Sequence, residues 1–133
     1  MSRHSALRFL SGLSLTAFFG GACSAERLVQ VMETPPSVKT YVDLDSVKID
    51  GDIRTAKEIT KFASIAEAWM PVSMETVLEF NCRLATGRSL STVTRFRNGQ
   101  SQVTAESAEI FKVERNGSLA ELKFRLICRS DPR

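Results

Sequence analysis

Hydrophobic and polar residues alternate most regularly between Met74 and Leu84. A strict alternation predicts a strand whose side chains point in turn to a buried and to an exposed face. The expected buried side carries Met74, Thr76, Leu78, Phe80, Cys82 and Leu84. Gly87 interrupts the pattern, and residues 89–97 form the next expected strand, which ends at an Asn98-Gly99 turn. The two strands should form a hairpin with the Cys82 thiol on its buried side.

The first half of the chain predicts a meander of three further strands. Residues 27–34 are rich in β-forming residues and stop at Pro35 and Pro36. Residues 38–44 alternate, and an Asp50-Gly51 pair predicts a turn into a strand from Ile53 to Ala63.

The segments between and after these strands give weaker patterns. Residues 65–69 suit one helical turn that Pro71 would end, and we expect a connection there. Residues 99–108 are polar and predict a loop, whereas residues 110–114 predict a short strand before an Asn116-Gly117 turn.

The last segment, residues 118–128, fits two kinds of element. Leu122, Phe124, Leu126 and Cys128 alternate as in a strand, whereas Leu119, Leu122 and Leu126 suit one side of a helix. Ser118 with Glu121 three residues later is a capping box, in which the two side chains satisfy free amides at a helix start. The capping box favours a helix with Cys128 in its last turn, packed on a sheet core that includes Leu78 and Phe80.

The first 25 residues resemble a secretory signal peptide. Arg3 and Arg8 precede an apolar stretch that closes with small residues and is too short for a comfortable membrane span. Cleavage after Ser24 or after Ala25 would remove Cys23. Alternatively, Cys23 becomes the acylated first residue of a lipoprotein. We expect an exported protein with a single domain at residues 26–133, in the periplasm or at the outer-membrane surface.

The chain contains three cysteines. Every processing route leaves Cys82 and Cys128 as the only thiols besides Cys23. Because an even pair of cysteines in an exported protein indicates a disulfide, we expect Cys82 and Cys128 to be bonded. Cys82 is then a structural cross-link and no nucleophile.

Charge and composition exclude several functions. The net charge of +3 at pH 7 falls to about +1 when Arg3 and Arg8 leave with the signal peptide, which gives no support for nucleic-acid binding. His4 is the only histidine and would leave too, so a histidine base and a histidine-ligated zinc site are not expected. We predict no enzymatic activity and no cofactor.

Two groups of charged residues are candidate binding features. Arg83, Arg95 and Arg97 would share the outward face of the predicted hairpin, with Arg88 at its turn, and forked guanidinium groups recognise sulfated glycans or acidic proteins. A solvated face balanced by Glu75 and Glu79 is the favoured alternative. A second group, Asp43, Asp45, Asp50 and Asp52, invites a calcium hypothesis, but its spacing does not follow a calcium-binding loop, and no metal is expected.

The single tryptophan, Trp69, also has two interpretations. It suits an exposed binding anchor, because tryptophan is frequent at interaction hot spots. A position at the edge of the core is the favoured interpretation.

Three stretches together resemble the surface-adhesin protein E family of exported bacterial proteins. They are "TYVDLDSVKIDGDIRTAKEI", "VSMETVLEFNCRLATGRSLSTVTRF" and "NGSLAELKFRLIC", and the similarity runs from about Leu28 to Cys128. The resemblance implies an α+β fold: an antiparallel sheet of about six strands, a C-terminal helix packed on one face, and one disulfide between the fourth-strand region and the helix.

The resemblance also implies a function and partners. A family member of this kind is expected at the cell envelope as a binding protein for host matrix or serum proteins, attached to a membrane only through a lipid at Cys23. The alternative is a structural or accessory protein of the periplasm that contacts an envelope component and never meets the host.

Overall fold

The computed structural model describes residues 27–34, 37–63, 69–105 and 109–130. The predicted signal peptide, Cys23 and most of the predicted turn at residues 65–69 lie outside them. The strands are β1 (Leu28–Thr34), β2 (Val38–Asp50), β3 (Ile53–Phe62), β4 (Pro71–Asn81), β5 (Thr86–Phe96), β6 (Ser101–Ala105) and β7 (Phe111–Lys112). One α-helix, α1 (Leu119–Arg129), follows them.

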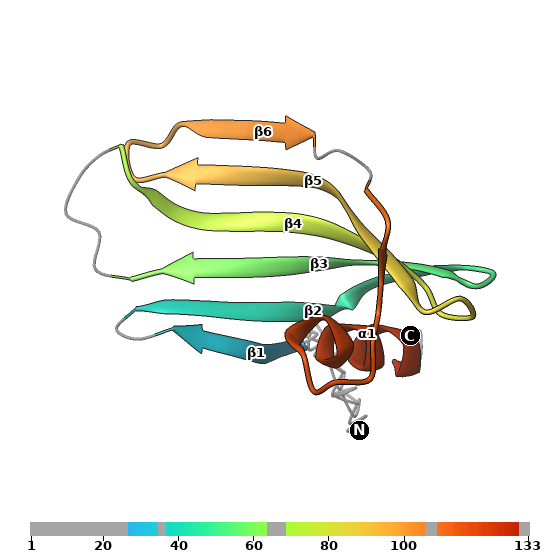
Figure 1. Ribbon diagram of the computed structural model, residues 1–133. Coiled ribbons are helices and arrows are strands. Elements are labelled where there is room, and N and C mark those ends of the chain that lie inside the picture. The colour runs from blue at the N-terminus through green and yellow to red at the C-terminus, as the bar shows by residue number, and fades with distance from the viewer. Residues whose placement is uncertain (1–26, 35–36, 64–68, 106–108, 131–133) are drawn as a thin grey trace, which may run out of the picture.

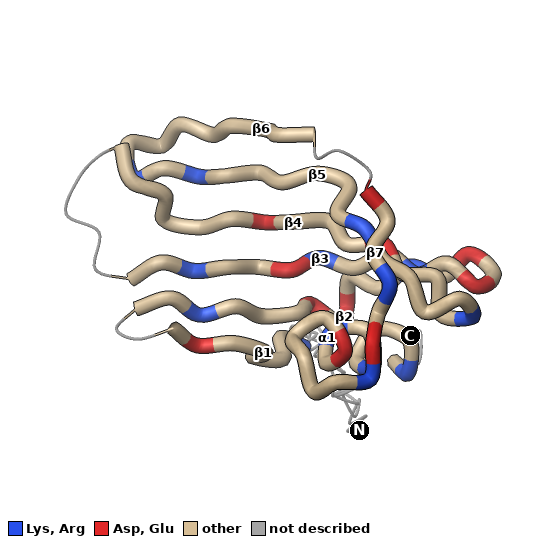
Figure 2. Tube along the Cα trace, viewed as in Figure 1, with Lys and Arg blue, Asp and Glu red and all other residues tan. Residues whose placement is uncertain are grey.

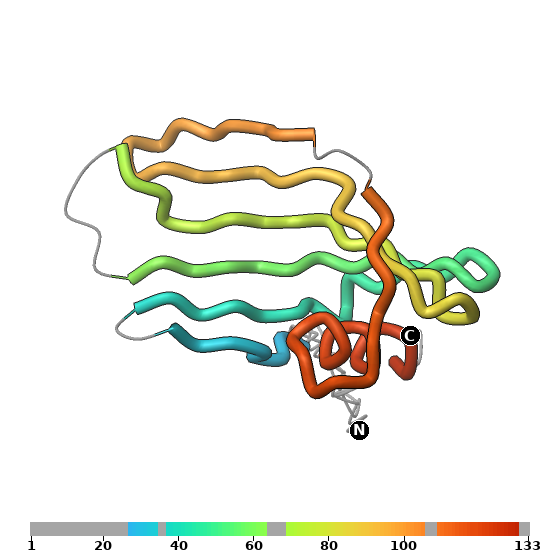
Figure 3. Tube along the Cα trace, in the orientation of Figure 1, coloured from blue at the N-terminus to red at the C-terminus, as the bar shows by residue number. Residues whose placement is uncertain are grey.

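The strands form one antiparallel sheet in the order β1-β2-β3-β4-β5-β6, with β7 paired to β5 (Figure 1). After β6 the chain crosses the ends of the central strands and brings α1 back beside β1 and β2 (Figure 3). The helix lies at one end of the sheet, and the other end extends away from it (Figure 1). The predicted α+β fold, with about six strands and a C-terminal helix on one face, is confirmed.

The turns follow from a few residues. Gly51 opens the two-residue turn between β2 and β3 with a φ of 59°, which glycine adopts without a Cβ clash. Between β4 and β5 the side-chain oxygen of Asn81 accepts hydrogen bonds from the amides of Arg83 (3.1 Å) and Leu84 (2.9 Å). These bonds close a turn over Cys82–Ala85, so Cys82 lies after β4 and Leu84 is 55% exposed. The prediction that the strand continues to Leu84 was wrong, whereas the Cys82 thiol does point to the helix side, where it bonds to Cys128.

Two further predictions on this side of the sheet were also wrong. Residues 101–105, expected in a loop, form β6, which pairs with β5 through contacts such as Val93 opposite Val103. Every residue of β6 is exposed, so no alternation marked it in the sequence. Gly87 lies inside β5, where a Cβ would come within 2.7 Å of the Phe80 ring. Glycine is therefore required there for close packing.

The core lies between the sheet and α1. Val42, Ala56, Leu78 and Phe80 of the sheet are buried together with Ile127 of the helix. The ring of Phe80 makes edge contacts with Phe124 and Phe111, at centroid distances of 5.8 and 6.2 Å. The core predicted at Leu78 and Phe80 is confirmed, but the innermost helical residue is Ile127, and Leu122 is 38% exposed.

Three kinds of interaction hold α1. The Ser118 side chain accepts the amide of Glu121 at 3.2 Å, as the capping box predicts, while the Glu121 carboxylate accepts the amide of Gly117 at 2.9 Å. Cys128 forms the predicted disulfide with Cys82. The Arg54 side chain donates to the carbonyls of Ile127 (2.9 Å) and Ser130 (2.7 Å). Beneath the helix, Glu58 of β3 forms an ion pair with Lys123.

These contacts define the two faces of the sheet. Arg54, Glu58 and Phe80 touch α1 and mark the helix face. Side chains alternate along a strand, so the residues between them point to the opposite face, which we call the open face. The ion pair between Lys57 and Glu75 (3.1 Å) lies there. Among the described residues, no helix is long and apolar enough to cross a membrane.

Candidate functional site

The structure separates the four arginines predicted to form one strip. Arg83 lies in the β4–β5 turn and binds Asp52 at 2.9 Å, and Arg88 of β5 binds Glu79 at 2.7 Å. Arg95 lies near the other end of β5, with Arg97 just beyond it. Arg95 is seven positions along the strand from Arg88, which is roughly 23 Å. The four residues therefore do not form one continuous strip.

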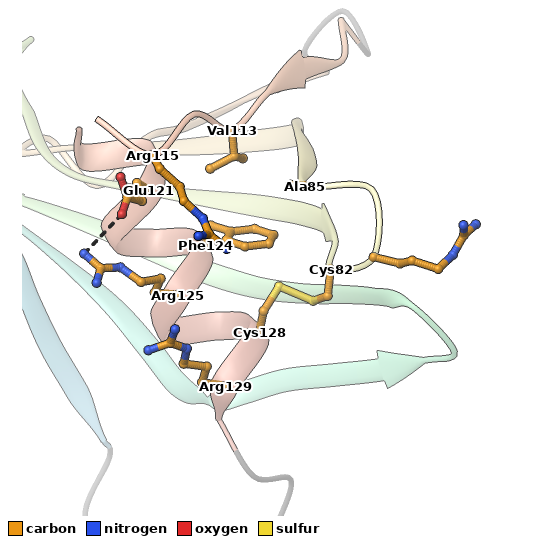
Figure 4. A pocket seen from close by; sticks show the side chains of 10 residues that line it. Cys82, Ala85, Val113, Arg115, Glu121, Phe124, Arg125, Cys128 and Arg129 are labelled. Atoms are coloured by element: carbon orange, nitrogen blue, oxygen red, sulfur yellow. Dashed lines mark ion pairs between the residues drawn. A yellow bond between two sulfur atoms is a disulfide. The ribbon is translucent and has the colours of Figure 1, made fainter. Parts of the chain in front are cut away.

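Arg83 alone of the four lines a hollow of about 440 Å³ beside α1, which we call the arginine pocket (Figure 4). It is lined by Cys82, Arg83, Ala85, Val113, Arg115, Glu121, Phe124, Arg125, Cys128 and Arg129. The β4–β5 turn, the segment after β7 and α1 each supply part of the lining, and the disulfide joins the first part to the third. The pocket therefore exists only in the folded, closed arrangement of sheet and helix.

The helix period explains why charge gathers in this pocket. Glu121, Arg125 and Arg129 are spaced four residues apart, so they lie above one another on one side of α1. The Arg125 guanidinium contacts the Glu121 carboxylate at 3.3 Å. Arg115 and Arg129 have no ion-pair partner in the described part of the chain. Arg83 is paired with Asp52 and Arg125 with Glu121, so Arg115 and Arg129 are the excess cations of the lining, and Phe124, Ala85 and Val113 add an apolar wall.

The pKa of the Glu121 carboxyl lies below its ordinary value. The main cause is the hydrogen bond from the Gly117 amide, and the Asn116 backbone and the charges of Arg125 and Arg115 act in the same direction against a desolvation effect. Glu121 is therefore an anion at neutral pH and orients Arg125. A guanidinium held in this way binds carboxylate, sulfate or phosphate through paired hydrogen bonds.

Comparison with known families now gives the pocket a context. The family model described as Surface-adhesin protein E matches residues 28–129. The chain belongs to this family. Comparisons with curated proteins and with solved structures find no match. Membership implies an exported protein of adhesin-like, non-enzymatic type, and both half-cystines and the whole lining of the arginine pocket fall within the matched residues.

The aspartates of this adhesin E-family protein have structural contacts. Asp45 binds the Arg27 side chain at 3.0 Å, and Asp52 binds Arg83. The Asp43 carboxylate accepts the amide of Asp45 at 3.0 Å. Where the structure is described, no three histidine, cysteine, aspartate or glutamate side chains are grouped so that they could hold a metal ion.

The structure contradicts the favoured interpretation of Trp69. Its side chain is 67% exposed, so the expected position at the core edge is wrong. The alternative, an exposed anchor for binding, stays a hypothesis.

The arginine strip predicted from the sequence did not include Arg115, Arg125 or Arg129. The spacing of Glu121, Arg125 and Arg129 was a usable signal, because it puts three charges on one side of the predicted helix. Arg115 carried no such signal, since only the fold brings it opposite the helix.

Proposed function

We propose that this family member is a non-enzymatic binding protein at the cell surface that contacts an acidic segment of a host matrix or serum protein through the arginine pocket. The observation that carries the proposal is the excess of arginine over acid in the pocket, where Arg115 and Arg129 form no ion pair with any described residue. A carboxylate from a partner would supply the missing anion.

The size and lining of the pocket limit what it can hold. A volume of about 440 Å³ is near the lower end of the range for ligand sites, which suits one or two side chains and no larger segment. Arginine is frequent at interaction hot spots, where a few desolvated residues supply most of the binding free energy. The surrounding surface must add area, because specific interfaces bury at least about 1,000 Å². Of the sequence-predicted strip, only Arg83 lies at this pocket.

A binding assay with matched variants tests the role of the pocket. We expect Arg115→Ala/Arg129→Ala to bind a panel of immobilised matrix and serum proteins about 10- to 100-fold more weakly, since a hydrogen bond to a charged group contributes about 1.5–3 kcal/mol. The control Lys48→Ala/Lys112→Ala removes the same charge from two exposed positions and should bind like the wild type. Equal binding by all three proteins would overturn the role of the pocket.

Accessibility on intact cells tests the location. An antibody against a C-terminal tag should label intact cells if the domain faces outward. Labelling only after permeabilisation of the outer membrane would overturn host contact and support the periplasmic accessory role. Cys23→Ser adds the test of lipidation: it should release the protein from the membrane fraction if Cys23 is acylated, and change nothing if cleavage follows Ser24 or Ala25.

A further inference from the structure

The strand register assembles a row of positive charge that spans the sheet. Lys39 of β2 lies opposite Lys61 of β3, Lys61 opposite Ser73 of β4, and Ser73 opposite Arg95 of β5. We call Lys39, Lys61 and Arg95 the basic row. Figure 2 shows its three blue segments aligned across β2, β3 and β5, at the end of the sheet away from α1.

The basic row lies on the open face. Lys61 is three positions along β3 from Glu58, which contacts α1, so its side chain points to the opposite side. Lys39 and Arg95 point the same way through the register with Lys61 and Ser73. All three side chains are exposed. No described helix covers them, and a flat ligand could reach all three together.

Two other cations of the open face, Lys57 and Arg88, are neutralised, whereas the basic row is not. Lys57 binds Glu75 and Arg88 binds Glu79. No residue of the basic row has an ion-pair partner in the described part of the chain. Lys61 lies 5.5 Å from the centroid of the Tyr41 ring, which orients the amine without neutralising it.

The nearest acid by register offsets part of this charge. Glu33 lies opposite Lys39 and accepts a hydrogen bond from Gln30 at 3.3 Å, but it forms no ion pair with Lys39 among the described residues. On its other side Lys39 lies directly opposite Lys61, and like charges in directly opposite positions destabilise a sheet. A bound polyanion would relieve this repulsion.

The dimensions of the basic row suit an extended chain of anions. Neighbouring strands lie about 4.8 Å apart, so the row from Lys39 to Arg95 covers roughly 14 Å. Ser73 occupies the gap, and Ser101 continues the row on β6. Both can add hydroxyl hydrogen bonds between charged groups. A linear polymer lying across the strands would meet these groups in succession.

Trp69 lies at the same end of the sheet. It precedes Pro71, the first residue of β4, and the amide of Arg97 donates to the carbonyl of Met70 at 3.2 Å. This bond ties the Trp69 segment to the end of β5, two residues past Arg95. An exposed tryptophan face carries a negative quadrupole and packs well on the C–H groups of a sugar ring.

We propose that the basic row and Trp69 bind a linear sulfated polysaccharide, with the sulfates on the cations and a sugar ring on Trp69. The combination favours this class, because a single-stranded nucleic acid is usually bound by several aromatic side chains interleaved with basic ones. This inference goes beyond the protein contact proposed above. The two sites share no residue, so either proposal can fail without the other.

The test uses heparin as the probe and the full mature protein. We expect the row variant Lys39→Gln/Lys61→Gln/Arg95→Gln to bind heparin about 100-fold more weakly at low salt. Each basic residue near an anionic surface contributes about fivefold in affinity, and the variant removes all three. Its dependence on salt should also be shallower, because fewer counterions are released. The control Lys48→Gln/Lys57→Gln/Lys112→Gln has the same net charge and should bind like the wild type. Thermal unfolding checks that both variants fold.

Trp69 gives an independent measurement. It is the only tryptophan, so its fluorescence should change on titration with heparin oligosaccharides. Trp69→Ala should weaken binding while leaving the salt dependence unchanged, because the contact is not ionic. Equal heparin affinity of the row variant and the control would overturn the site. Equal binding of desulfated heparin, or of single-stranded DNA, would overturn the assignment of a sulfated polysaccharide.

Discussion

The bond between Cys82 and Cys128 should contribute a large share of the stability of this protein. Replacing both cysteines, as Cys82→Ala/Cys128→Ala, removes the link between the β4–β5 turn and the last turn of α1. The helix would then be held to the sheet by the Arg54 and Glu58 contacts and by the apolar core.

The size of the effect follows from the length of chain that the bond closes. The cysteines are 46 residues apart, and in the loop-entropy model a cross-link of this span raises the free energy of the unfolded chain by about 4 kcal/mol. Domains of this size have free energies of unfolding of about 5–15 kcal/mol. At about 4–8 °C per kcal/mol for roughly 100 residues, the melting temperature should fall by about 15–30 °C.

Thermal unfolding followed by circular dichroism measures this effect directly. A reductant should lower the melting temperature of the wild type towards that of the double variant and should not change the variant. The reasoning would be refuted if the double variant melted within about 3 °C of the wild type, since that is less than the effect of 1 kcal/mol. It would also be refuted if the reductant lowered both proteins equally.

Three further changes test packing and charge. Gly87→Ala places a Cβ 2.7 Å from the Phe80 ring and should cost about 1–3 kcal/mol in the free energy of unfolding, measured by urea denaturation; an unchanged midpoint would contradict the close packing. The side chains of Glu58 and Lys123 are only 14% and 17% exposed, so Glu58→Gln leaves a nearly buried amine without its anion. The free energy of unfolding should fall by about 3 kcal/mol. The double variant Glu58→Gln/Lys123→Met should recover most of that loss, and no recovery would exclude the pair as the cause. The lowered pKa of Glu121 makes its stabilisation present above the unfolded pKa and lost as the pH falls through the folded one. Melting temperatures of wild type and Glu121→Gln should therefore differ by a constant amount near neutral pH and converge in acid, whereas a gap that persists at low pH would disprove the charge effect.

Elements with local signals could be predicted from the order of residues alone. The alternation around Leu78 and Phe80 identified β4, the Asp50-Gly51 pair identified the β2–β3 turn, and Ser118 with Glu121 identified the start of α1. Each signal comes from side chains that bond to their own backbone or from one face that is buried, so it can be recognised from residues close together in the sequence. The cysteine count and the expected export predicted the disulfide in the same way.

The positions at which distant residues meet depend on the folded arrangement of the strands and the helix. β6 carries no pattern because both of its faces are exposed, and it exists through backbone pairing with β5. Cys82 lies in a turn because strand pairing stops at Asn81 opposite Thr86. Lys39, Lys61 and Arg95 form one row through a register that spans four strands, and Arg115 reaches the arginine pocket because the chain crosses the sheet before α1. Binding surfaces depend on such non-local contacts, which a one-dimensional pattern of polar and apolar residues does not encode.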